Sequence, residues 1–201
     1  MSRLYRFCRS VLVMMVLSVS VTALGADPNP EDFVRTKQDQ LSSILKQPKS
    51  GAREKTVSNA IDAVFDYGEL AQRSLGEEWK NRSDDERKQF RELLEGLVRQ
   101  TYRRSIDSTL GWQVDFKGRT VKDGTTVVAT VAKHKTDARK APVAVDYAMK
   151  QTDGSWRVVD ITIEGSSLTQ NYRSQFTKII KKKGFGELIT KMKARLAKGQ
   201  G

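Results

Sequence analysis

The chain has 201 residues, with 36 Lys and Arg against 24 Asp and Glu, and a formal net charge of +12. One cysteine, Cys8, and one histidine, His134, exclude a disulfide framework and a zinc site built from Cys and His clusters. The sequence also has no Gly-x-Ser-x-Gly elbow and no glycine-rich phosphate loop, the motifs of many hydrolases and nucleotide-binding enzymes.

The N-terminus has the layout of a secretory signal peptide. Three arginines precede an apolar run from Val11 to Leu24, which ends in two small residues. The run is shorter than the ~20 apolar residues of a membrane span, and an uncleaved anchor is the alternative. We therefore expect residues 1–26 to be a cleaved signal peptide and residues 27–201 to form one exported domain.

Export changes how the charge is interpreted. Cleavage would remove Cys8 and the three arginines, so the net charge would fall from +12 to +9 because the segment holds no acidic residue. A cysteine-free exported chain fits the bacterial periplasm. There, this charge favours an anionic membrane surface, lipid headgroups or an acidic protein partner over nucleic acid. Solubility alone is the simpler alternative.

The first half of the exported chain is predicted to be helical. Asn29-Pro30 is a helix start, and apolar residues at helical spacing indicate a second helix from about Ala52. A shorter helix is expected over 67–75, closed by Gly76. Ser83 and Glu86 then form the capping box of a long amphipathic helix that reaches to about residue 106.

After Gly111 the hydrophobic pattern alternates, which predicts antiparallel strands. Strands are expected over 112–116, 125–131, 143–149 and 156–163, with turns at Asp123-Gly124 and Asp153-Gly154. The adjacent Val158 and Val159 indicate a bulge or a strand covered on both faces.

Gly165-Ser166 is expected to end the sheet, and two more helices follow, the first starting at Ser167 and ending before Gly184. The order of elements predicts an α+β fold, with a curved antiparallel sheet packed against N-terminal and C-terminal helices. Helices on a concave sheet can enclose an apolar cavity, but composition alone favours a fully packed core.

Few residues suggest catalysis. His134 lies between two lysines at the end of a predicted strand, where a surface role is expected. Four acids, Asp115, Asp146, Asp160 and Glu164, lie on or beside predicted strands and could form a carboxylate pair. Acids on sheets usually face outward and pair with Lys or Arg. The residues therefore give catalysis little support, with the carboxylate pair left open, and we expect no metal site and no cofactor.

Two segments resemble the Mla-type, or toluene-tolerance, periplasmic phospholipid-binding proteins. The first contains Phe65-Asp66-Tyr67, Leu70-Ala71, Leu75-Gly76, Trp79, Arg87, Phe90 and Thr101-Tyr102. The second, more specific segment contains residues 156–161, then Glu164-Gly165, Ser167-Leu168 and Asn171-Tyr172-Arg173. Val159 departs from the pattern, because many relatives have an aromatic residue there.

The resemblance implies a nuclear-transport-factor-like cone that buries lipid tails between helices and sheet and is not an enzyme. It implies a carrier of phospholipid that maintains outer-membrane lipid asymmetry, and we expect that carrier to be a monomer. Its implied partners are an inner-membrane ABC transporter with an MCE-domain protein and an outer-membrane lipoprotein and porin complex. Small isomerases and dehydratases share this fold type, and that alternative requires Asp146, Asp160 or Glu164 in the cavity beside Tyr147. A lipid-independent adaptor, with a filled core, is a third possibility.

Within this framework we expect ten residues to line the acyl pocket: Phe65, Leu70, Trp79, Phe90, Leu94, Val98, Tyr102, Tyr147, Met149 and Ile161. Tyr172 and Arg173 are candidates for the mouth of the pocket, with Arg173 contacting a headgroup phosphate. The alternative for these two residues is a structural lock between the helix after the sheet and its neighbours.

Overall fold

A computed structural model describes residues 29–199, so the expected signal peptide lies outside the described residues. Helices α1 (Pro30–Leu45), α2 (Gly51–Asp62), α3 (Tyr67–Leu75) and α4 (Asp84–Ser105) come first. The strands are β1 (Trp112–Lys122), β2 (Thr125–His134), β3 (Val143–Thr152), β4 (Ser155–Ile163) and β5 (Ser166–Ser167). Helices α5 (Leu168–Lys183) and α6 (Phe185–Lys198) follow, and short 3-10 helices, η1 (Gly76–Trp79) and η2 (Ile106–Gly111), extend α3 and α4. This order confirms the α+β prediction.

Local capping signals set the helix boundaries. The side chains of Asn29 and Ser167 each accept an N–H from the first turn of α1 and α5, both at 3.1 Å. Ser83 and Glu86 form the reciprocal capping box of α4. The predicted helix starts are confirmed to within one residue.

The sheet has the order β1-β2-β3-β4-β5, and every neighbouring pair is antiparallel. Both predicted hairpin turns are present, with positive φ at Asp123-Gly124 and at Asp153-Gly154, as two-residue hairpin turns require. Ala148 pairs with Asp160 and Met149 with Val158, which leaves Val159 as the extra residue of a bulge. Val158 and Val159 are both fully buried, so each face of β4 is covered at this point.

The structure corrects several predicted strand ends: β2 reaches His134 rather than residue 131, and β3 reaches Thr152 rather than residue 149. Strand β1 continues to Lys122 rather than ending at residue 116, because residues 117–122 are mostly polar and exposed and therefore show no alternation. The sheet does not end at Gly165-Ser166. After a turn at Glu164-Gly165, where both residues have positive φ, Ser166–Ser167 pair with the end of β4 as β5.

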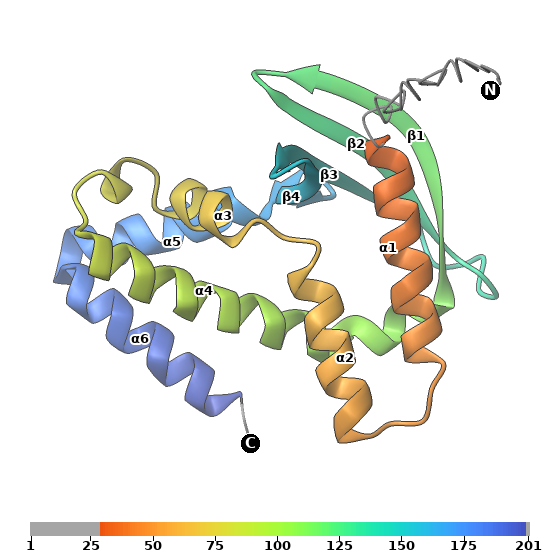
Figure 1. Cartoon of the computed structure of the whole chain (residues 1–201), viewed down its shortest axis with the longest axis horizontal. Coiled ribbons are helices and arrows are strands. Elements are labelled where there is room, and N and C mark those ends of the chain that lie inside the picture. The colour runs from red at the N-terminus through yellow and green to blue at the C-terminus, as the bar shows by residue number, and fades with distance from the viewer. Residues whose placement is uncertain (1–28, 200–201) are drawn as a thin grey trace, which may run out of the picture.

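The helices cover the sheet unequally. Figure 1 shows α1 against the β1–β2 end of the sheet, with α3, α4, α5 and α6 gathered at the opposite end.

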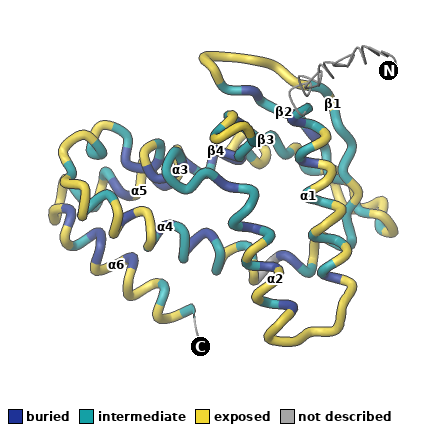
Figure 2. Tube along the Cα trace, viewed as in Figure 1, coloured by how far each residue is buried: buried dark blue, intermediate teal, exposed yellow. Residues whose placement is uncertain are grey.

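Between these four helices lies a packed region that we call the helical core, formed by Leu70, Leu75, Phe90, Leu94, Phe176, Phe185 and Leu188. The Phe90 ring meets Phe176 edge-on at 5.5 Å and lies 6.4 Å from Phe185. Buried positions follow the inner side of each of these helices in Figure 2.

A buried carboxylate connects the sheet to α5. Asp160 on β4 is 8% exposed and accepts three hydrogen bonds. They come from the Ile161 N–H (2.9 Å), the Ser167 hydroxyl (2.6 Å) and the Thr169 N–H (3.0 Å). Two of these donors belong to the turn where α5 begins, so the Asp160 carboxylate fixes how that helix leaves the sheet.

We predict that Asp160→Ala destabilises the protein, because it leaves buried donors without an acceptor. The free energy of unfolding should fall by about 2–3 kcal/mol. Asp160→Asn, which keeps one acceptor oxygen, should lose less. Urea unfolding followed by circular dichroism measures both, with Asp123→Asn at an exposed turn as the control. Equal stability of Asp160→Ala and the control would contradict this role.

Candidate functional site

A cavity of about 550 Å³ lies between α1, the α2–α4 region and the inner face of the sheet. This volume falls within the ~300–1,000 Å³ range of sites that hold small molecules. Its apolar lining is Phe33, Val34, Leu41, Ala60, Ile61, Val64, Phe65, Tyr102, Ile106, Leu110, Trp112, Val114, Phe116, Ala132, Val145, Tyr147, Val158, Ile161 and Ile163. Its polar lining is Arg35, Lys37, Gln38, Asp39, Ser42, Ser108, Thr109, Gln113, Thr130 and Lys135.

The connection between α2 and α3 forms one wall of the cavity. The Val158 N–H donates to the Val64 carbonyl at 2.8 Å, and the Asp66 N–H donates to the Val158 carbonyl at 3.0 Å. Phe65 is thereby bridged to Val158 of β4. The Phe65 ring then lies 5.5 Å from the ring of Tyr102 on α4. Backbone pairing therefore fixes the position of this aromatic wall of the cavity. Side-chain packing alone would allow the wall to shift.

The interior is uncharged at neutral pH. Burial raises the pKa of the Tyr102 hydroxyl, and the nearby Tyr147 raises it further. Burial also raises the pKa of Tyr147, against the opposing effect of a hydrogen bond with Gln38. Both tyrosines therefore remain protonated. Each contributes an apolar ring and a neutral hydroxyl to the lining of the cavity.

The charged lining residues lie at the edge of the cavity, not in its depth. Arg35, Asp39 and Lys135 are exposed, and Lys37 is half-buried. Residues at the sheet side of the cavity, such as Thr130 and Ile161, are buried. The cavity thus combines a neutral, mostly apolar interior with a polar rim, which suits an amphipathic ligand.

The ten predicted pocket residues fall into two groups. Four of them, Phe65, Tyr102, Tyr147 and Ile161, line the cavity. The structure places the other six outside its lining: Leu70, Phe90, Leu94, Val98 and Met149 are fully buried in the packed core, and Trp79 lies partly buried on η1. The Trp79 ring has the Arg87 guanidinium 5.5 Å from its centroid.

The two predicted mouth residues also lie away from the cavity lining. Tyr172 is buried, and its ring stacks on that of Phe176 at 5.2 Å. The Arg173 side chain donates to the Arg73 carbonyl through Nε at 2.8 Å and Nη2 at 2.6 Å. These bonds join α5 to the end of α3.

Sequence reasoning missed the contribution of α1 and β1 to the cavity. Phe33, Val34 and Leu41 on α1 and Trp112, Val114 and Phe116 on β1 all line it. The sequence predicts a helix that starts at Asn29-Pro30 and an alternating strand over 112–116. Neither pattern indicates whether an apolar face meets a filled core or a cavity.

The candidate catalytic acids lie outside the cavity lining. Asp160 is held at the start of α5, and the Glu164 carboxylate accepts the Ala144 N–H at 2.5 Å. Lys133, whose Nζ lies 2.8 Å from the Asp115 carboxylate, holds the pKa of that carboxyl below its usual range. Asp146 is also absent from the lining of the cavity. Among the described lining residues Asp39 is the one acid, and it is exposed.

His134 has a structural environment. Its Nδ1 accepts the Asp137 N–H at 3.1 Å, and its ring meets Trp112 edge-on at 5.2 Å. Across residues 29–199 no group of His, Cys, Asp and Glu is arranged to hold a metal ion.

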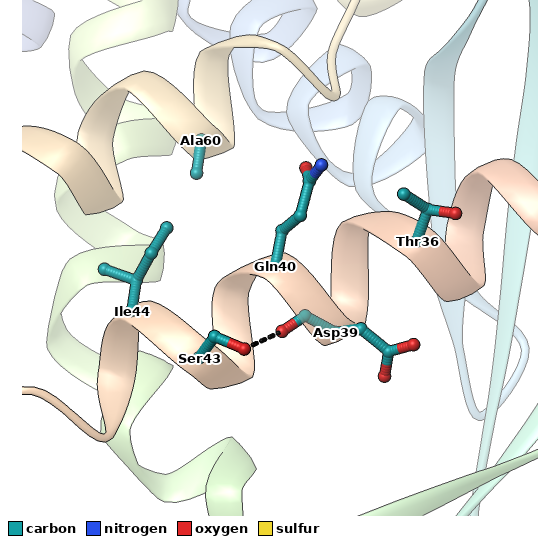
Figure 3. Close-up of a pocket in the computed structure, with 6 residues that line it drawn as sticks. All are labelled: Thr36, Asp39, Gln40, Ser43, Ile44 and Ala60. Atoms are coloured by element: carbon teal, nitrogen blue, oxygen red, sulfur yellow. Dashed lines mark hydrogen bonds between the residues drawn. The ribbon is translucent and has the colours of Figure 1, made fainter.

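A second hollow lies between α1 and α2. Figure 3 shows Gln40 and Ile44 of α1 reaching toward Ala60 of α2, while the Ser43 hydroxyl donates to the Asp39 carbonyl at 3.0 Å. Its polar residues are all exposed, and their visible bonding is local to α1. We assign no function to this hollow.

None of the helices in the described part of the chain is both long enough and apolar enough to cross a membrane. The structure is similar to that of a phospholipid-binding protein from Ralstonia solanacearum, solved in complex with a phospholipid. The two chains are 23% identical, with a TM-score of 0.73 over 85% of this chain and 98% of that chain. Comparison with curated proteins found no match.

The family model described as MlaC protein matches residues 35–194, which include every strand and nearly all of the helical residues described above. Because this match spans most of the sequence, the chain belongs to the MlaC family.

Proposed function

We propose that this protein is a periplasmic carrier of phospholipids, and that the acyl chains occupy the cavity between α1 and the sheet. The observation that carries the proposal is the neutral, mostly apolar interior with a polar rim. A methylene group gains ~0.8 kcal/mol on leaving water, so a chain of about 14 methylenes gains roughly 11 kcal/mol before the costs of ordering. Family membership and the phospholipid bound by the Ralstonia protein support the same ligand class.

The proposed carrier function also includes export and exchange with two membrane complexes. A signal peptide, residues 1–26, directs export and is then cleaved, and residues 27–201 act as a single domain. The protein exchanges phospholipid between an inner-membrane ABC transporter with an MCE-domain protein and an outer-membrane lipoprotein and porin complex, which maintains lipid asymmetry. The net positive charge supports contact with anionic headgroups and membrane-side partners.

Neither alternative function gains support from the described residues. An isomerase or dehydratase needs acid and base groups inside the cavity, and Asp146, Asp160 and Glu164 are not in its lining. An adaptor that binds no lipid would have a filled core in place of the cavity. We propose that the protein has no enzyme activity, and that Phe65, Tyr102, Tyr147 and Ile161 contact the acyl chain.

The proposal predicts that protein purified from the periplasm without detergent carries lipid. Native mass spectrometry should show a discrete mass increment, and extraction should identify a phospholipid. Ala132→Phe projects a ring into the cavity and should weaken lipid binding roughly tenfold. Ala129→Phe, on the same strand but outside the cavity lining, is the matched control and should retain its lipid.

A protein that is recovered free of lipid, and that stays free after incubation with phospholipid vesicles, would overturn the carrier function. Equal lipid content in Ala132→Phe and Ala129→Phe would instead show that the lipid binds outside this cavity.

We further propose that Arg173 acts as an anchor between α5 and α3 and makes no contact with a headgroup. Arg173→Leu should then lower the free energy of unfolding by about 1–2 kcal/mol, since two bonds to the Arg73 carbonyl are lost. Its lipid content should not change. Lys178→Leu removes an exposed cation from the same helix and controls for charge. Lipid loss in Arg173→Leu without loss of stability would favour the headgroup role.

A further inference from the structure

The rim of the cavity carries three positive charges and one negative charge among the described residues. Arg35 and Lys37 belong to α1, and Lys135 directly follows β2. The one acid of the lining is Asp39. Cations therefore approach the cavity from two elements, α1 and the end of β2.

These three cations are available to a ligand. Within residues 29–199, none of them lies within salt-bridge distance of an Asp or Glu carboxylate. By contrast, Arg99 pairs with Asp62 at 2.6 Å and Lys150 with Glu69 at 2.9 Å. Lys37 Nζ reaches the side-chain oxygen of Gln40 at 3.4 Å, and Lys135 Nζ donates to the Leu110 carbonyl at 2.8 Å. Both partners are neutral and leave the positive charge uncompensated.

The Arg35 side chain is also oriented. Its guanidinium carbon lies 4.3 Å from the centroid of the Phe116 ring, and Phe116 itself lines the cavity. Stacking on an aromatic face leaves the edge of the guanidinium, with its N–H groups, free to bind an oxyanion. Arg35 thus places its guanidinium beside an apolar wall of the cavity.

An amphipathic anion fits both parts of this site. The neutral interior admits an acyl chain but penalises a buried charge, so the charged end of the ligand must remain at the rim. There it meets an excess of unpaired cations. These cations attract a headgroup with a net negative charge more strongly than a zwitterionic headgroup.

Resting on the proposed function, we propose that Arg35, Lys37 and Lys135 form a rim site that selects phospholipids with a net anionic headgroup. The chemistry recognised is an acyl lipid whose headgroup phosphate has no compensating positive charge. Each exposed cation contributes a modest, salt-sensitive attraction. The combined preference should be about three- to tenfold at low ionic strength.

The test uses mature protein stripped of lipid and incubated with vesicles of equal phosphatidylglycerol and phosphatidylethanolamine content. Lipid extracted from the re-isolated protein should be enriched in phosphatidylglycerol, and the enrichment should fall as salt increases. The variant Arg35→Gln, Lys37→Gln, Lys135→Gln should still take up lipid, with a ratio of phosphatidylglycerol to phosphatidylethanolamine near one. The control variant Lys178→Gln, Lys182→Gln, Lys193→Gln makes the same charge change on exposed faces of α5 and α6 and should keep the enrichment.

Each contrary result has a distinct meaning. Equal uptake of both lipids by the unmodified protein, or equal loss of preference in both triple variants, would overturn the rim site. Binding of inorganic phosphate that needs the three cations, without lipid preference, would identify a free-phosphate site and also overturn the proposal. Failure to take up any lipid would contradict the carrier function itself.

Discussion

The structure depends on the pairing of the α2–α3 connection with β4. Two backbone hydrogen bonds join Val64 and Asp66 to Val158. The Asp66 side chain accepts the Glu69 N–H at the start of α3 and the Thr152 hydroxyl from β3, both at 2.9 Å. One short segment therefore fixes a helix start and a cavity wall to the sheet. A side-chain contact of the same area would hold these parts less rigidly, because backbone hydrogen bonds are directional and obligatory.

This pairing lies between two regions with different packing. Toward α3, α5 and α6, aromatic and leucine side chains fill the helical core and are fully buried. Toward α1, residues such as Tyr147, Val145 and Phe116 are only partly buried although their side chains are apolar. Packed interiors leave little free volume, so incompletely covered apolar walls are the physical sign of a site that a ligand completes.

Local signals in the sequence were sufficient for most of the fold. The capping box at Ser83, the Asp-Gly turns and the doubled Val158-Val159 each specify backbone geometry within a few residues. The outer part of β1 was missed because residues 117–122 are polar and largely exposed, and burial on one face is what produces alternation. The pairing of β5 with β4 depends on only two residues, too few for a periodic pattern.

The site was harder to predict because residues on one face of α4 lie in two different environments. Phe90 and Tyr102 lie on the same apolar face of α4, yet Phe90 packs against Phe176 and Tyr102 lines the cavity. Along α4 the neighbours change: Phe90 lies near Phe176 of α5 and Phe185 of α6, whereas Tyr102 lies near Phe65 of the α2–α3 connection. Periodicity reports the apolar face but not the partner that covers it.

The arrangement separates stability from ligand binding. The sequence has no cysteine after Cys8, so apolar packing, hydrogen bonds and ion pairs hold the described residues together without a disulfide. The helical core and the buried anchors Asp160 and Arg53 lie outside the cavity lining, and Arg53 donates to the Leu45 carbonyl at 3.1 Å and to Asp107 at 2.5 Å. These contacts hold both ends of the structure without filling its centre. A lipid that entered would add apolar burial to a framework already fixed, and binding to the folded state alone would stabilise it in proportion to the logarithm of lipid concentration.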